Sequence, residues 1–199
     1  RARRVEARLA ALPAATVDDM VQIHSDVESL TAPVFQQRLR ALAPQAGDAG
    51  RVQALIAQWD ARMDAASPAA AAYVVWRWEL AAVLLERSGL AATRGDPLTQ
   101  LPPGVVPLNQ LWWALPQLVR ANDTALLSGM DWDQAFALAL EHAAPRIDGR
   151  PWAAHHRAAL VHPLAAQFPQ AAAQLNPVGA GLGGDNDTVL ANGCLSASG

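Results

Sequence analysis

Apolar side chains recur at helical spacing in the first part of the chain. Within residues 16–34 they return every three or four positions, and Thr16 followed by Asp19 resembles a capping box that begins a helix. Pro33 has no backbone donor, so we expect it to bend or break this helix before a second piece over residues 34–42. The expected apolar face of the first helix consists of Val17, Met20, His24, Val27, Leu30 and Val34.

Capping residues predict two further helices. Asp48 is the expected cap of a helix that ends near Ala65, and Val52, Leu55, Ile56, Trp59 and Met63 form its apolar face. Asp131 and Gln134 have the spacing of a second capping box, which opens a helix with Trp132, Phe136 and Leu140 turned inward. Between these two helices, residues 89–107 are rich in Gly, Pro, Thr and Asp, which predicts a long surface connection. A helix then follows from residue 108, with Pro116 as a kink.

The most apolar stretch of the chain begins at Ser67-Pro68, a cap followed by a first helical residue. The run to Leu85 is apolar on nearly every side, which invites comparison with a membrane-spanning helix. Its uninterrupted part is too short for a bilayer, and Arg77 and Glu79 lie within it. The sequence therefore favours a buried central helix.

The pattern changes after residue 150. Residues 156–162 alternate with a period of two, which predicts a strand, and a second strand is expected over residues 188–191. The fold class predicted is α+β, mainly α-helical with a short C-terminal β portion, divided into a helical region 1–150 and a strand-and-turn segment 151–199. A lone strand cannot satisfy its own backbone donors and acceptors, and the chain begins inside a helical pattern, so we expect it to be part of a longer protein.

Composition and charge narrow the function classes. The chain has 199 residues, 52% of them hydrophobic, which is enough to bury the core of one domain. All 15 basic residues are arginines spread along the sequence, and the net charge is -3, so the sequence offers no basic stripe for nucleic acid and no polybasic membrane patch. A single cysteine, Cys194, excludes an internal disulfide and a cysteine-built metal site.

Three histidines near the end of the chain suggest a zinc site. His155, His156 and His162 carry the side chain that zinc binds most often, but only His156 and His162 would share a strand face. A zinc site needs three or four converging ligands, so the sequence favours a structural role. We expect His162, held extended by Pro163, to pair with a buried carbonyl or carboxylate. His24, on an apolar helix face, is expected to be a core histidine.

The glycine-rich segment 179–184 resembles a phosphate loop, but it lacks the Lys-Ser/Thr ending and runs into Asp185 and Asp187, whose charges would repel a phosphate. Asp185, Asn186 and Asp187 also suggest a calcium-binding loop, although the glycine and the final glutamate of such a loop are absent. We expect a tight glycine turn in which both aspartates accept backbone N–H groups before Thr188 enters a strand.

These residues occur in an order that resembles the penicillin acylase family. The resemblance extends to the related acyl-homoserine-lactone and cephalosporin acylases, and it points to the later half of the catalytic β chain. Three positions depart from the family pattern, because Ala153, Ala165 and Asn186 stand where the family often has glycine. The matching residues are Gln22, Asp26, Ser29, Ala32 and Leu39; Trp59-Asp60; Ser67-Pro68; Trp76 and Leu80; Trp152 and His155; His162-Pro163-Leu164; Gly184-Asp185; and Asp187-Thr188-Val189.

The resemblance implies an αββα N-terminal nucleophile hydrolase fold and an amidase activity. In this family a serine at the start of a processed chain attacks an acyl amide, with its own α-amino group as the base. That serine and the asparagine that holds the oxyanion would lie upstream of residue 1. Arg1 matches the active-site arginine of the family, with a solvated surface arginine as the alternative reading. His155, His162, Asp185, Asp187 and Thr188 are expected to hold structure.

The resemblance also implies partners and surroundings. It predicts a small N-acyl substrate such as a penicillin, an α chain from the same precursor, no cofactor within these residues, and calcium elsewhere in the parent protein. It implies a periplasmic or secreted enzyme of antibiotic metabolism. The alternative is a helical scaffold or interaction module of the same descent without catalysis, which the sequence of the parent protein would distinguish.

Overall fold

The computed structural model describes residues 1–90, 107–157, 161–177 and 179–191, and for residues 107–109 it describes the backbone only. The chain forms two compact units, which we name the terminal unit and the helical unit. The terminal unit contains Arg1–Leu30, Ala61–Ala70 and Arg150–Gly199, and the helical unit contains Thr31–Asp60 and Ala71–Gly149. The division of the chain at residue 150 into two regions stays a prediction.

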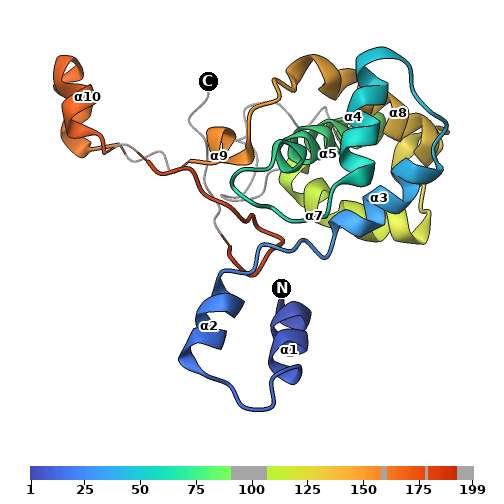
Figure 1. The fold of residues 1–199 in the computed structure, drawn as a ribbon. Coiled ribbons are helices and arrows are strands. Elements are labelled where there is room, and N and C mark those ends of the chain that lie inside the picture. The colour runs from blue at the N-terminus through green and yellow to red at the C-terminus, as the bar shows by residue number, and fades with distance from the viewer. Residues whose placement is uncertain (91–106, 158–160, 178, 192–199) are drawn as a thin grey trace. The chain divides into compact units, whose positions relative to one another are not determined.

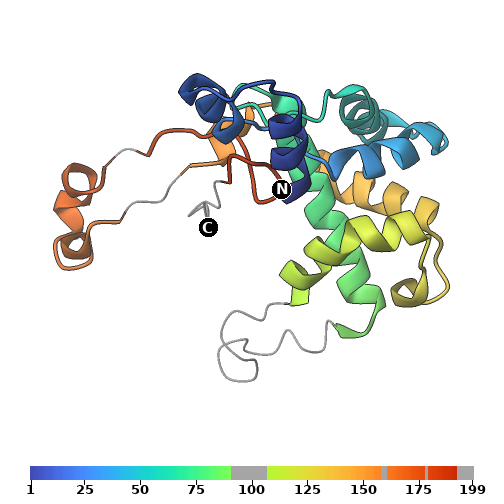
Figure 2. The same ribbon diagram turned by 90° about the horizontal axis from the view of Figure 1, so that it is seen from below.

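The helical unit is built around the long helix α5 (Figures 1 and 2). Helix α3 packs on α4 and on α7, and α4 packs on α8. The elements are α3 (Ala32–Ala41), α4 (Gly47–Gln58), α5 (Pro68–Arg87, of which residues 71–87 belong to this unit), α7 (Pro107–Ala121), η2 (Ala125–Leu127), α8 (Trp132–Ala143) and η3 (Ala144–Arg146).

An aromatic cluster forms the centre of this unit. The ring of Trp76 lies edge-on to Phe35 and Phe136, with centroid distances of 5.7 and 5.0 Å, and all three side chains are fully buried. Such edge-to-face pairs add to the free energy gained by burial. By length and composition alone α5 could cross a bilayer, but 72% of its most apolar window is buried inside the protein. The prediction of a buried central helix is confirmed.

The predicted caps are largely present. Thr16 and Asp19 form a reciprocal capping box at the start of α2, Asp131 and Gln134 form another at α8, and the Ser67 hydroxyl accepts the backbone N–H of Ala70. These residues supply partners for backbone donors that the first turn of a helix leaves free.

The bounds predicted for α4 were wrong. Its N-cap is Ala46, and Asp48 lies in the first turn, where it forms an ion pair with Arg51. The helix ends at Gln58, not near residue 65, because the buried Gln36 amide donates to the carbonyl oxygens of Ile56 and Trp59 and Trp59 turns extended. A side chain from α3 thus terminates α4, which no local pattern in α4 reveals.

Pro33 also acts differently from the prediction. It is the second residue of α3, where its missing donor costs nothing, and the preceding helix has already ended at His24. The residues between the two helices are irregular, because the backbone N–H of Glu28 donates to the carboxylate of Asp26 and Ser29 bonds to Ala61.

The terminal unit consists of short helices joined by extended chain. Residue Met63 is central to it, since its N–H donates to Val27 while its carbonyl accepts from Gly184. Residue Leu190 donates to Asp26 in the same layer of chain. Three segments distant in sequence are therefore joined through their backbones. The helices are α1 (Ala2–Ala10), α2 (Val17–His24), α9 (Trp152–His155), η4 (Pro163–Ala165), η5 (Pro169–Ala171) and α10 (Ala172–Leu175).

The two predicted strands are absent from the described residues. The segment before the first one forms α9, Arg157 makes only an isolated bridge to Gly181, and residues 158–160 lie outside the described residues. Residues 188–190 form a series of bends and Ala191 is irregular. The strand predicted over residues 188–191 does not form because the hydroxyl of Thr188 bonds to the backbone of Asp185, which keeps this residue in a turn.

The apolar face expected for the first helix is only partly buried. Within α2, Val17 is 80% exposed, His24 is exposed and Met20 is half-buried, and the helix buries only Ile23, which the expected face did not include. Val27, of the same expected face, is buried but lies beyond the end of α2. The prediction that His24 is a core histidine was therefore wrong. Periodicity identifies an apolar face but does not say that the same chain covers it.

Candidate functional site

Close packing of backbone explains the glycines that precede Asp185. A Cβ on Gly181 would overlap the carbonyl oxygen of Ala153, and a Cβ on Gly184 would overlap that of Leu190. Gly184 also has φ of +74°, a conformation that favours glycine. The segment is a packing element of the terminal unit, in line with the tight glycine turn that the sequence favours over a phosphate loop.

Asp185 organises the turn that follows. Its Oδ1 accepts the backbone N–H of Asp187 at 2.8 Å and of Thr188 at 3.1 Å. In return, the buried Thr188 hydroxyl accepts the backbone N–H of Asp185 at 2.9 Å. Asp185 thus makes the backbone contacts expected of it. The corresponding role for the half-buried Asp187 stays a prediction.

Arg1 joins the first helix to this turn. Its Nε donates to the carbonyl oxygen of Thr188, and its Nη2 donates to that of Asn186, each at 3.0 Å. These two bonds orient the guanidinium against the turn. Arg1 is nevertheless exposed, so its match to the active-site arginine and the solvated alternative both stay predictions.

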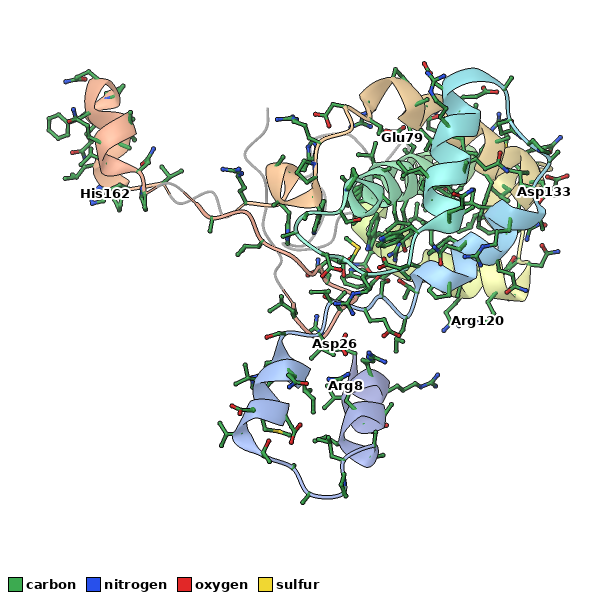
Figure 3. The ribbon with its side chains drawn as sticks, in the orientation of Figure 1. Arg8, Asp26, Glu79, Arg120, Asp133 and His162 are labelled. Carbon is green, nitrogen blue, oxygen red and sulfur yellow. The ribbon has the colours of Figure 1, made fainter. Side chains whose placement is uncertain are left out.

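Asp26 forms an ionic centre in the terminal unit, whereas the sequence indicated it only as a residue that matches the family and gave no sign of its ion pairs. Its carboxylate, 4% exposed, receives Nε and Nη2 of Arg4 at 2.8 Å each, and Nε of Arg8 lies 3.7 Å away. Figure 3 shows Arg8 and Asp26 turned toward each other. Arg4 also pairs with Glu28. Sequence spacing gave no signal, since 22 residues separate Arg4 from Asp26 and no helix relates them.

The three histidines do not come together as a metal site. His156 is buried, stacks on Trp152 with a centroid distance of 4.5 Å, and lies with Nδ1 3.1 Å from the carbonyl oxygen of Leu182. His155 is half-buried on α9. His162 is exposed, and its Nδ1 accepts the N–H of Leu164, so the expected pairing with a buried carbonyl or carboxylate was wrong. His162 instead caps the short helix η4, whose first residue is Pro163.

The described residues do not fit calcium at the aspartate turn. Calcium needs six or more oxygen ligands, yet Oδ1 of Asp185 is already the acceptor for two backbone N–H groups. Over the part of the chain that the structure describes, no three His, Cys, Asp or Glu side chains are grouped as metal ligands would be.

In the helical fold and in the turn at residues 185–188, the buried polar residues bond to the backbone. Comparison with known proteins shows the family to which the chain belongs. The family model described as penicillin amidase matches residues 1–197. The chain is also 44% identical over 200 positions to the penicillin acylase 2 proenzyme of Pseudomonas sp. (strain SE83). The chain therefore belongs to the penicillin amidase family, as its sequence motifs predicted. The alignment covers 100% of this chain and 26% of that relative.

Proposed function

We propose that this chain is part of an amidohydrolase that cleaves the acyl amide bond of penicillins, acyl-homoserine lactones or related N-acyl compounds. The observation that carries the proposal is the match to the penicillin acylase 2 proenzyme, which extends over the whole chain at 44% identity. Substrate class and mechanism enter by family resemblance, and the fold of the complete protein would be the αββα arrangement of N-terminal nucleophile hydrolases.

In this proposal the 199 residues contribute one side chain, that of Arg1, to the active site. A serine at the start of a processed chain attacks the acyl carbon with its α-amino group as the base, and an asparagine stabilises the oxyanion; both lie outside these 199 residues. Arg1 is the active-site arginine. Its bonds to Thr188 and Asn186 support this role, because a pre-oriented cation loses little entropy when it acts on a developing charge.

The remaining predicted residues hold structure. Asp185 and Thr188 fix the turn on which Arg1 rests, while His155, His162 and Asp187 support the surrounding chain. We place the enzyme in the periplasm or outside the cell, paired with an α chain from the same precursor, and any calcium in other parts of the protein. The word proenzyme in the name of the relative supports processing from a precursor.

The test uses the intact parent protein and measures release of the free amine from penicillins and N-acyl-homoserine lactones. We expect turnover of at least one of these substrates. The Arg1→Ala variant should lose most of the turnover rate while it matures normally, and Arg3→Ala, which removes an exposed arginine from the same helix, should have little effect. Correctly processed protein that hydrolyses none of these amides would instead favour the non-catalytic scaffold.

A further inference from the structure

The carboxylate of Asp26 anchors helix α1 through charge. The helix itself buries no residue, and its Leu9 is 43% exposed. By contrast, Oδ2 of Asp26 lies 2.8 Å from both Nε and Nη2 of Arg4 and 3.7 Å from Nε of Arg8. The side chain of Asp26 is only 4% exposed, so these charges are screened little by solvent. Two successive turns of α1 are therefore held by one buried carboxylate.

The backbone of Asp26 holds the turn against which Arg1 lies. Its carbonyl oxygen accepts the N–H of Leu190 at 2.9 Å. Two residues before Leu190, the carbonyl oxygen of Thr188 accepts Nε of Arg1 at 3.0 Å. The hydroxyl of Thr188 donates to the carbonyl oxygen of Leu190 at 2.7 Å, which ties these two residues together. Asp26 thus binds both the helix that follows Arg1 and the turn that Arg1 contacts.

Arg1 closes this ring of contacts. It is the N-cap residue of α1, and its carbonyl oxygen accepts the backbone N–H groups of Arg4 and Val5 at 3.0 and 3.1 Å. Arg4 therefore lies one helical turn from Arg1, and its guanidinium ends on Asp26. Because Arg1 is exposed, burial does not hold its side chain. A shift of α1 relative to the turn would break the bonds of Arg1 to that turn.

We propose that Asp26 is a positioning residue for Arg1. By pairing with Arg4 and accepting the N–H of Leu190, it fixes the start of α1 against the turn at residues 185–188, and so fixes the direction of the Arg1 guanidinium. The inference rests on the proposed function for the part that Arg1 plays in the reaction. A displacement of about 1 Å in a reacting group can cost a rate factor of about 100, so loss of this anchor should be visible in turnover.

The charge of Asp26 is the feature on which this role depends. Asparagine at this position has the same shape, and its oxygen can still accept the N–H of Glu28, as Oδ1 of Asp26 does at 2.9 Å. Its neutral amide does not balance the guanidinium of Arg4. Arg4 would retain its pair with Glu28, whose side chain is 35% exposed, and should turn toward it and toward solvent. Asp26→Asn thus removes the buried anchor of α1 with little change in volume.

The test is a double-mutant cycle of Asp26→Asn and Arg1→Ala in the matured intact protein. It measures kcat and KM for whichever penicillin or N-acyl-homoserine lactone the protein turns over fastest. Asp26→Asn should lower kcat by about tenfold or more, with a smaller change in KM. In the Arg1→Ala background the same substitution should change kcat by less than about twofold, because the group on which it acts is gone.

Asp64→Asn is the matched control. It breaks another aspartate–arginine pair of the same unit, in which Nε of Arg62 lies 3.0 Å from Oδ2 of Asp64. Both of these side chains are nearly half exposed, so the substitution should leave kcat unchanged. If Asp26→Asn does not mature, Arg4→Lys takes its place in the cycle with the same expected pattern, since lysine keeps the charge but lacks the forked donors.

A crystal structure of the matured Asp26→Asn protein gives a reading that is independent of turnover. Nε of Arg1 should lie beyond hydrogen-bonding distance of the Thr188 carbonyl oxygen, with the turn itself intact. The Arg4→Lys protein serves for this reading too if Asp26→Asn does not mature.

Two kinetic results would overturn the inference. The first is an unchanged kcat in Asp26→Asn beside a strongly impaired Arg1→Ala, which would leave the proposed function standing. The second is an equal fall of kcat in both backgrounds, which would make Asp26 a general support of the fold. Full turnover by Arg1→Ala would instead contradict the proposed role of Arg1, and the crystal structure then decides. A displaced Arg1 supports the positioning by Asp26, and an Arg1 still bonded to Thr188 overturns it.

Discussion

The guanidinium carbon of Arg77 lies 3.8 Å from the centroid of the Trp112 ring, and Nη2 of the same arginine donates to the backbone carbonyl of Trp112 at 2.9 Å. Arg77 is fully buried, and its Nη1 reaches the hydroxyl of Tyr73 at 3.2 Å. A single side chain thus joins α5 to α7 by a cation–π contact and by hydrogen bonds. The arginine noted in the sequence as an interruption of an apolar run is a fixed part of the core.

Replacing this arginine by lysine should destabilise the intact protein. An ammonium group cannot make the planar, forked contacts of a guanidinium, so Tyr73 or the Trp112 carbonyl loses its partner. We expect Arg77→Lys to lower the free energy of unfolding by about 1–3 kcal/mol, as measured by urea titration. Arg87→Lys, at the exposed end of the same helix, is the control, and equal stability of the two variants would contradict this role.

The Asp185 turn predicts a difference between an alanine and an amide substitution. Asp185→Ala removes the acceptor of two backbone N–H groups and should cost about 1–3 kcal/mol of stability. Asp185→Asn retains an oxygen at the same place and should cost less. Thermal unfolding of the intact protein measures both, and a loss as large for asparagine as for alanine would rule out this hydrogen-bonding role.

Asp187 gives a prediction about function as well as stability. If Asp187 supports the turn, Asp187→Ala should lower the free energy of unfolding by about 1–3 kcal/mol and reduce the yield of matured protein. The catalytic rate of correctly matured protein should stay nearly the same. Normal maturation with loss of the catalytic rate would place Asp187 in the active site. The yield of processed protein and the kcat of the purified fraction are the two measurements.

Gly184 is a site where any side chain should be harmful. Gly184→Ala forces both a left-handed backbone on alanine and a collision with the carbonyl of Leu190. Gly149→Ala has the same sign of φ but open space around the added carbon, so it isolates the backbone cost of about 1–2 kcal/mol. We expect Gly184→Ala to lower the melting temperature clearly more than Gly149→Ala. Equal effects would mean that the backbone around Leu190 moves freely.

The cap of α2 predicts a pH dependence. The hydroxyl of Thr16, and then its backbone N–H, donate to the carboxylate of Asp19 and lower the pKa of that group below its ordinary value of 3.8. Because the folded pKa is the lower one, the ionised carboxylate stabilises the cap above 3.8, and the effect is lost as the pH falls through the folded value. In an NMR titration, Thr16→Ala should return the pKa of Asp19 toward 3.8. An unchanged pKa would contradict the assignment.

Local patterns in the sequence predicted the caps and the central helix well. The capping boxes at Thr16 and Asp131 depend on residues three positions apart, and the buried α5 depends on a continuous apolar run. Each of these signals is contained within one element, so tertiary contacts do not alter it.

Two features were missed because a distant residue decides them: Gln36 on α3 ends α4, and Asp26 binds an arginine 22 positions earlier. The wrongly predicted second strand has a local cause, since Asp185 bonds to Thr188 three positions later and turns the chain. The exposed part of the face expected for α2 is a further difference, since periodicity shows amphipathicity but not what lies opposite. Family resemblance supplied the descent of the chain, which none of these physical patterns indicates.

The most direct measurement compares the intact parent protein with the 199-residue chain in one amidase assay. We propose that the serine nucleophile and the oxyanion asparagine lie outside these residues, so the intact protein should release amine from an N-acyl substrate and the chain alone should not. A denatured sample of the chain sets the background. Turnover by the isolated chain above that background, or none by the matured intact protein, would contradict the account.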